Sequence, residues 1–166
     1  MFAALQVLTV MIVAVAMALV LAHALELPGK MRLSREHYLA VQPIYYPGFT
    51  FGGMAEPIGL VLLLVLLFFT PFESAPFWLT AGAFASLLAM HATYWLLTHP
   101  VNNFWLKDFT LKRAGTTFFS FDPLSRSADA DRPDWTLLRD RWEQSHIIRT
   151  GFAILSFVLL VTAVVI

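Results

Sequence analysis

Cysteine is absent from the 166 residues of this chain, and charged side chains are scarce. Without cysteine the chain forms no disulfides, no thiolate metal sites, no iron–sulfur clusters and no Cys nucleophile. Asp, Glu, Lys and Arg make up only 13% of the residues, whereas a soluble domain usually has about a quarter. Lys plus Arg equals Asp plus Glu at 11 each, so no basic excess indicates a nucleic-acid partner.

Apolar side chains are the abundant class instead. They make up 58% of the chain, and its mean hydropathy is +0.70. A helix that crosses a membrane needs about 20 mostly apolar residues. Four runs contain no Asp, Glu, Lys or Arg: residues 2–25, 58–72, 74–98 and 150–166. The second run is short, so its helix spans only if it begins near Gly52 and takes Glu56 into the membrane.

These runs predict the fold class and its boundaries. We expect an all-α integral membrane protein in which residues 1–166 form a single four-helix bundle. The helices should cover about residues 2–26, 52–72, 75–99 and 134–166. The segment Leu21-Ala22-His23-Ala24 resembles a signal-peptide cleavage site, but no Lys or Arg precedes it and the apolar run is longer than a signal-peptide core. We therefore expect the first helix to remain in the protein.

The basic residues indicate the orientation in the membrane. Three of the 11 Lys and Arg follow the first helix, and the other eight lie between the third helix and the start of the fourth. In a chain with four spans these two loops are on the same side, and basic loops remain in the cytoplasm. The sequence therefore predicts a multi-pass protein of the cell membrane, with cytoplasmic charged loops and both termini outside.

The segment after the first helix is rich in aromatic residues, at Tyr38, Tyr45, Tyr46, Phe49 and Phe51. Proline and glycine residues among them exclude one long helix. Tyrosine is enriched where the membrane meets water. We therefore expect an interfacial aromatic loop after the first helix.

The segment before the fourth helix changes character along its length. Residues 116–121 are rich in Thr and Phe and favour a β-strand, and the polar residues 125–132 are expected to form a surface loop. After Asp134, the residues Trp135, Leu138 and Trp142 recur at helical spacing. The fourth helix should therefore begin as an amphipathic cytoplasmic extension and continue into the membrane.

Polar residues from all four helices are expected at one depth. When about 20 residues are counted inward from the outer end of each helix, the same layer is reached by His23, Glu26, Glu56, His91, His99, His146 and Arg149. Ionisable groups at such a depth usually face the bundle interior and have a partner. Natural pairs are Glu26 with Arg149, or Glu56 with a histidine. Pro100 disfavours helical geometry at His99, where we expect the third helix to end.

Three motifs carry a resemblance: Glu26-Leu27-Pro28, His99-Pro100-Val101-Asn102-Asn103, and Trp135-x-x-Leu138-Arg139-x-Arg141-Trp142-Glu143-x-x-His146-x-x-Arg149. Together they make the chain similar to the anthrone-oxygenase-like family of small four-helix membrane proteins. Some members assist the oxidation of polyketide anthrones to quinones by dioxygen without a dedicated cofactor, and most have no assigned activity. The resemblance implies roles for Asn102, Trp142 and Arg149. The chain differs from the family in its histidines at 99 and 146 and in a long Phe-rich insertion after Asn103.

The first functional interpretation is a membrane oxygenase or oxidoreductase that acts on an apolar aromatic or lipid-like substrate at the cytoplasmic interface. His99 or His146 would take a proton from the substrate, because imidazole titrates near neutral pH. Glu26 would orient that histidine, while Asn102 and Arg149 would stabilise the developing oxyanion. The substrate would lie against four aromatic side chains, Tyr45, Tyr46, Trp95 and Trp142.

Two other interpretations stay open. Neutral imidazoles bind metals and haem, and four histidines lie on the helices of the bundle: His23, His91, His99 and His146. Alternatively, the polar layer only holds the helices together in a non-catalytic accessory or scaffold protein. The expected partners are the lipid bilayer and an apolar small molecule, and the cofactor is either none or a His-ligated metal or haem.

Overall fold

The computed structural model describes residues 1–105 and 134–166, and within these ranges the chain is helical throughout its regular elements, with no strand. Four stretches are long and apolar enough to cross a membrane: Phe2–Lys30, Gly48–Phe69, Ala75–Asn102 and Trp135–Val165. Their main helices are α1 (Phe2–Lys30), α4 (Ala55–Phe69), α5 (Ala75–Thr93) and α8 (Trp135–Val165). The predicted all-α, multi-pass membrane fold is thus confirmed.

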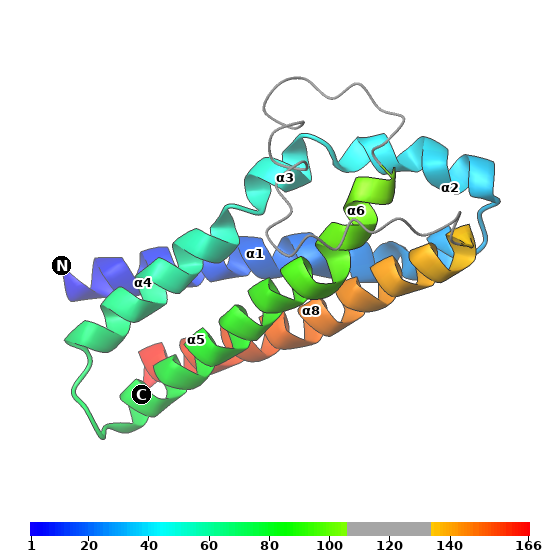
Figure 1. Ribbon diagram of the computed structural model, residues 1–166. Helices are drawn as coiled ribbons and strands as arrows, with labels where there is room; N and C mark the ends of the chain where they lie inside the picture. The colour runs from blue at the N-terminus through cyan, green and yellow to red at the C-terminus, as the bar shows by residue number, and fades with distance from the viewer. Residues whose placement is uncertain (106–133) are drawn as a thin grey trace.

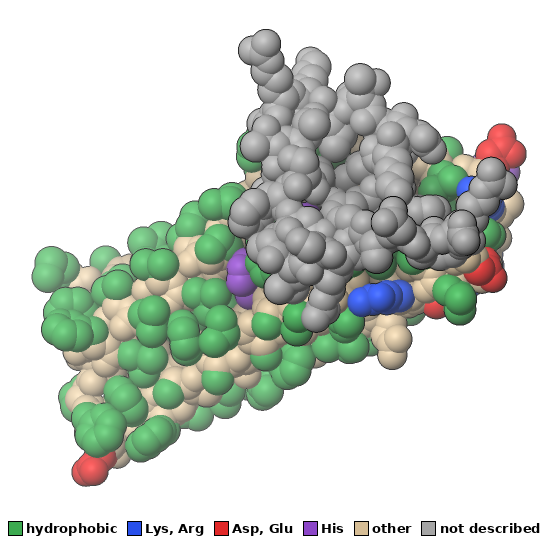
Figure 2. All heavy atoms as spheres, in the orientation of Figure 1, with side chains coloured by type: hydrophobic (Ala, Val, Ile, Leu, Met, Phe, Trp, Pro, Cys, Tyr) green, Lys and Arg blue, Asp and Glu red, His purple; other side chains and the backbone are tan. Residues whose placement is uncertain are grey.

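Both termini and the α4–α5 turn lie at one end of the bundle, and the short helices α2 and α6 lie toward the other (Figure 1). The interior is packed with small and medium apolar residues, among them Val13, Leu63, Leu87 and Leu160, which are fully buried. Hydrophobic side chains also cover the outside of the bundle (Figure 2). This outward apolar surface is what a helix bundle presents to lipid, because hydrocarbon solvates it as well as the interior does.

Hydroxyl groups inside the bundle connect the helices. Thr150 Oγ1 donates to the backbone oxygen of Val20 on α1 at 2.9 Å, and Ser156 Oγ donates to that of Ala83 on α5 at 2.8 Å. Both hydroxyls are on α8 and both are buried. Since lipid offers no hydrogen-bond partner, such contacts hold neighbouring helices at close distance.

The ends of the first three helices differ from the prediction. The first helix does not end near residue 26 but continues through Pro28 to Lys30. A proline there removes one N–H donor near the end of the helix, and the N–H groups of Met31 and Arg32 still close the last turn on Leu27 and Gly29. The second helix ends at Phe69 rather than near residue 72.

The third helix does not end at His99. After α5, residues Tyr94–Thr98 form a π-helical turn and α6 (His99–Trp105) continues the chain. The N–H of His99 bonds to the backbone oxygen of Tyr94, five residues back. Pro100 has no N–H for the oxygen of Leu96, and Arg141 Nη2 donates to that oxygen instead, at 3.3 Å. The wide turn and the arginine from α8 therefore let the helix pass the proline.

The segment after α1 forms three short helices: α2 (Arg35–Val41), a 3₁₀ turn (Gln42–Tyr45) and α3 (Gly48–Gly52). One aromatic residue of this segment packs inside the protein. Tyr38 is fully buried and its hydroxyl donates to Glu143 Oε1 on α8 at 2.9 Å. α8 begins at Trp135, one residue after the predicted start, and the side chain of Asp134 caps it by accepting from the N–H of Thr136 at 3.0 Å. The predicted strand at 116–121 and loop at 125–132 lie outside the described residues.

Candidate functional site

A cavity of about 360 Å³ lies inside the bundle, toward the end away from the termini. It is lined by residues of α1, the 3₁₀ turn, α3, the start of α4, the end of α5 with its π turn, α6 and α8. Its lining is mostly apolar and aromatic: Leu19, Val20, His23, Gln42, Tyr45, Tyr46, Phe49, Thr50, Gly53, Met54, Glu56, Pro57, His91, Tyr94, Trp95, Thr98, Asn102, Trp142, His146 and Arg149.

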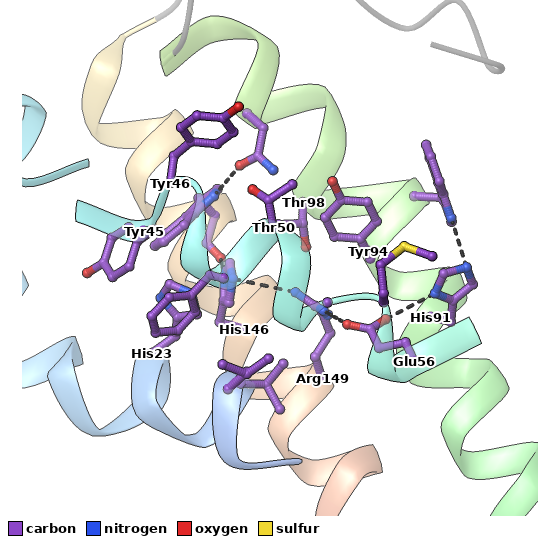
Figure 3. A pocket seen from close by; sticks show the side chains of 18 of the residues that line it. His23, Tyr45, Tyr46, Thr50, Glu56, His91, Tyr94, Thr98, His146 and Arg149 are labelled. Carbon is purple, nitrogen blue, oxygen red and sulfur yellow. Dashed lines mark hydrogen bonds and ion pairs between the residues drawn. The ribbon is translucent and has the colours of Figure 1, made fainter. Parts of the chain in front are cut away.

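A buried ion pair forms one wall of the cavity. Arg149 Nη2 on α8 donates to Glu56 Oε1 on α4, and the residues are only 6% and 5% exposed. The other carboxylate oxygen, Oε2, lies 3.0 Å from His91 Nδ1 on α5. The guanidinium also lies over the ring of Tyr94, with 5.1 Å to the centroid. Three helices are thus joined through one carboxylate (Figure 3).

The hydrogen bonds of His91 fix its protonation state. Trp95 Nε1 lies 3.1 Å from His91 Nε2, and an indole N–H can only donate, so Nε2 is the acceptor. Nδ1 therefore carries the proton and donates it to Glu56. His91 is a neutral imidazole with both nitrogens occupied.

His146 is neutral by the same reasoning but has a nitrogen nearly free. Its Nδ1 lies 2.9 Å from the backbone oxygen of Trp142, which only accepts, so this nitrogen carries the proton. Its Nε2 accepts from Arg149 Nη1 at 3.5 Å, which is at the long limit for a hydrogen bond. The one lone pair of this nitrogen is therefore engaged only by a long contact, which a proton of a molecule in the cavity can replace.

His23 lies directly against His146, with the ring centroids 4.2 Å apart. It is 5% exposed, and its Nδ1 makes no hydrogen bond among the described residues, with Glu26 Oε2 at 4.0 Å from it. Arg149 Nε likewise makes no hydrogen bond within that part of the chain. A buried polar atom without a partner costs about 1–3 kcal/mol, so the wall formed by these two side chains is suited to polar groups of a ligand.

A second polar cluster lies outside the cavity. Lys30 Nζ is 3.3 Å from Glu143 Oε2 and 3.4 Å from Glu26 Oε2, and it lies over the Trp142 ring with 4.8 Å to the centroid. Tyr45 Oη donates to Glu26 Oε2 at 2.6 Å. The predicted pair of Glu26 with Arg149 is therefore wrong, because α1 continues to Lys30 and places a closer cation one turn after Glu26. Burial and the hydrogen bond to Glu26 raise the pKa of Tyr45 above its ordinary value.

The model of a known family, described as anthrone oxygenase, matches residues 42–159. The chain belongs to the anthrone oxygenase family. No curated protein and no solved structure matches it. The match begins at Gln42, so it includes every cavity-lining residue except Leu19, Val20 and His23 on α1. Membership of this family indicates an oxygenase-like function, consistent with the resemblance seen in the sequence.

Most of the site residues that the sequence suggested meet at the cavity of this anthrone oxygenase family member. His146, Arg149, Asn102, Tyr45, Tyr46, Trp95 and Trp142 all line it. Asn102 Oδ1 accepts from Trp142 Nε1 at 2.7 Å, which fixes both side chains. His99 and Glu26 are not among the lining residues. His99 is 1% exposed, and its Nδ1 lies 3.4 Å from Tyr94 Oη.

Sequence reasoning gave no role to Glu56 as the partner of Arg149. The sequence did show Glu56 as the one charged residue that the second helix must take into the membrane. The expected pair of Glu56 with a histidine is present, and the histidine is His91.

The four histidines do not form a common metal site. Among residues 1–105 and 134–166, no three His, Cys, Asp or Glu side chains gather to hold a metal ion, and His91 has no lone pair to give. We therefore derive no step through a metal or haem.

Proposed function

We propose that the chain is a membrane-embedded oxygenase that oxidises an apolar aromatic or lipid-like molecule bound in the cavity. One observation carries the proposal. The cavity is walled by aromatic and aliphatic side chains, while its ionisable side chains form one contiguous row of contacts: His23, His146, Arg149, Glu56 and His91. A site for an apolar molecule with one reactive polar centre has this form.

The reaction that fits this wall begins with removal of a proton from the substrate. His146 Nε2 takes the proton from an acidic C–H or O–H of an aromatic substrate, and the resulting oxyanion is stabilised by Arg149 and by the amide N–H of Asn102. The electron-rich anion then reacts with dioxygen. For a ring CH₂ group the balance is CH₂ plus O₂ giving C=O plus H₂O, so dioxygen is the oxidant and one of its atoms leaves as water.

We assign the base to His146 rather than His99 because only His146 lines the cavity. Glu26 contacts Tyr45 and Lys30 and lies 4.0 Å from His23 instead of contacting His146, so it acts on the substrate through the positions of Tyr45 and His23. The backbone oxygen of Trp142 orients His146 in place of a carboxylate.

The test is oxygen uptake by purified protein in lipid vesicles, with anthrone and a series of hydrophobic phenols as probes. His146→Gln should reduce the uptake above the spontaneous rate by about 10²- to 10⁴-fold, the usual effect of losing a general base. His37→Gln is the matched control, because His37 is exposed on α2 and does not line the cavity. Uptake equal to the spontaneous rate for every probe, or unchanged by His146→Gln, would contradict the proposal.

A second candidate is a non-catalytic accessory protein. It is favoured by the contacts of Glu56, which connect α4 to both α5 and α8 inside the bundle. In that case the probes should neither react nor raise the melting temperature of the protein. A probe that raises the melting temperature of the wild type, but not that of a variant with the cavity filled by Val20→Phe, favours the enzyme.

A further inference from the structure

The wall of the cavity is buried on one side and exposed on the other. On α1 and α8, Val20, His23, Trp142 and His146 are at most 5% exposed. On the opposite side, Met54 at the start of α4 is 52% exposed, and the side chain of His91 on α5 is 27% exposed. Pro57 and Trp95, next to these two residues, are also partly exposed. Tyr45, Tyr46, Phe49 and Thr50 are partly exposed too, but Met54 is the most exposed of the lining residues, so the most exposed part of the wall lies between α4 and α5.

This exposed part lies at a depth that belongs to the membrane. Met54 precedes the end of α4 at Phe69 by 15 residues, and His91 follows the start of α5 at Ala75 by 16 residues. At about 1.5 Å per residue these positions are about 22 Å and about 24 Å from the outer ends of their helices. Both distances are shorter than the hydrocarbon thickness of about 30 Å.

The deep wall, in contrast, offers polar atoms that make no hydrogen bond within the described residues. Arg149 Nε is an obligate donor, and His23 Nδ1, whose nearest charged group is Glu26 Oε2 at 4.0 Å, can donate or accept. Both residues are more than nine-tenths buried. A molecule that enters past Met54 and Trp95 would bring its polar group to these atoms while its apolar part stayed near the rim.

We propose that the cavity receives its ligand from the lipid phase, through an opening between α4 and α5 rimmed by Met54, Pro57, His91 and Trp95. The ligand is a hydrocarbon-soluble aromatic molecule whose hydrogen-bonding group faces Arg149 and His23. The inference rests on the proposed function only in taking the cavity as the ligand site, and it holds whether or not the ligand is then oxidised.

The absence of cysteine allows a direct test. In vesicles, Val20→Cys places one thiol on the buried cavity wall, where it replaces a side chain of similar size. Its alkylation is compared for a long-chain alkyl maleimide, which stays in the bilayer, and a sulfonated maleimide present on both sides of the membrane. A second substitution, Met54→Trp, narrows the rim. Ile58→Trp is the matched control, because Ile58 is 44% exposed on the same helix but does not line the cavity.

We expect the alkyl maleimide to react at least ten times faster than the sulfonated one, and Met54→Trp to slow it several-fold while Ile58→Trp does not. Faster reaction with the sulfonated reagent would show entry from water and overturn the inference. Fast alkylation that Met54→Trp does not slow would place the entrance elsewhere and would also overturn the inference. No alkylation in the folded protein, with full alkylation after denaturation, would show a closed cavity. None of these outcomes depends on turnover, so they are separate from the failure of the proposed function.

Discussion

At the scale of single residues, Arg149 connects three neighbours in the cavity wall. It donates to Glu56 and His146 and lies over the ring of Tyr94. Each of these neighbours comes from a different part of the bundle or from the adjacent turn of α8. When one member of a buried pair is removed, the charge of the other remains in a medium of low dielectric constant without compensation.

Glu56→Gln should therefore be strongly destabilising. We expect a loss of about 3–5 kcal/mol in the free energy of unfolding, the usual effect of breaking a buried ion pair. The measurement is denaturant-induced unfolding in detergent. Glu73→Gln is the control, since Glu73 is exposed in the α4–α5 turn and its replacement should change stability by less than about 0.5 kcal/mol. Equal losses in the two variants would mean that the pair has no net effect. Arg149→Met added to Glu56→Gln should recover part of the loss.

Tyr38, which lies outside the membrane-spanning segments, should make the stability of the protein depend on pH. Burial, and then the negative charge of Glu143, raise the pKa of Tyr38 above its ordinary value. The folded protein therefore keeps this proton to a higher pH than the unfolded chain does. Its contribution to stability is complete below about pH 10 and is lost as the pH rises further, by about 1.4 kcal/mol per pH unit.

Tyr38→Phe should remove this part of the alkaline destabilisation. Unfolding free energies of wild type and variant, measured from pH 8 to pH 12, should differ most at pH 8. The difference should then shrink above about pH 10, because only the wild type loses this contribution. Two curves that stay parallel over the whole range would show that Tyr38 does not keep its proton preferentially in the folded state.

At the scale of helices, close packing and proline set the geometry around the cavity. The π turn at Tyr94–Thr98 turns α6 out of the line of α5 and places Asn102 next to Trp142. Farther along the bundle, α4 packs closely through Gly59. A Cβ atom there would lie 3.0 Å from Leu87 and 3.6 Å from Ile12 and Val13. Gly151 on α8 has open space, with nothing within 4 Å.

These two glycines should respond to substitution in opposite ways. Gly59→Val should destabilise the bundle by about 1–3 kcal/mol, because extra volume forces α4 away from α1 and α5. Gly151→Ala should leave stability unchanged or raise it by up to about 1 kcal/mol, since alanine favours the helix more than glycine does. Thermal unfolding in one detergent compares them. A stabilising Gly59→Val would mean that the α1–α4–α5 contact is loose.

At the scale of the whole molecule, the distribution of charge predicts the orientation. All 11 Lys and Arg lie on one side of the four-span topology, and this side should be cytoplasmic. Intact cells carrying Glu73→Cys or His37→Cys can be treated with an impermeant maleimide. Glu73→Cys should react and His37→Cys should not, whereas a permeant maleimide should label both. Reaction at His37→Cys alone would reverse the orientation.

The number of spans and the family follow from local features of the chain. Apolar length is a property of each segment, so four helices could be predicted without knowing how they pack. The motifs at Asn102 and from Trp142 to Arg149 supplied the family, and that assignment is confirmed by the match over residues 42–159. Counting along each helix also gave the depth of the polar layer, because helical rise converts residue number to height.

The partners within that layer were decided by the tertiary structure alone. Depth fixes one coordinate of a side chain, but the rotation of each helix and its choice of neighbours depend on packing of the whole bundle. Arg149 meets Glu56, 93 residues away, and Lys30 meets Glu143, 113 residues away, whereas depth alone also allowed Glu26 with Arg149. The proline at 100 suggested a helix end, and only the contact of Arg141 with Leu96 shows why the helix continues. Composition and periodicity determine that these residues share a layer, and long-range packing determines which of them face the cavity.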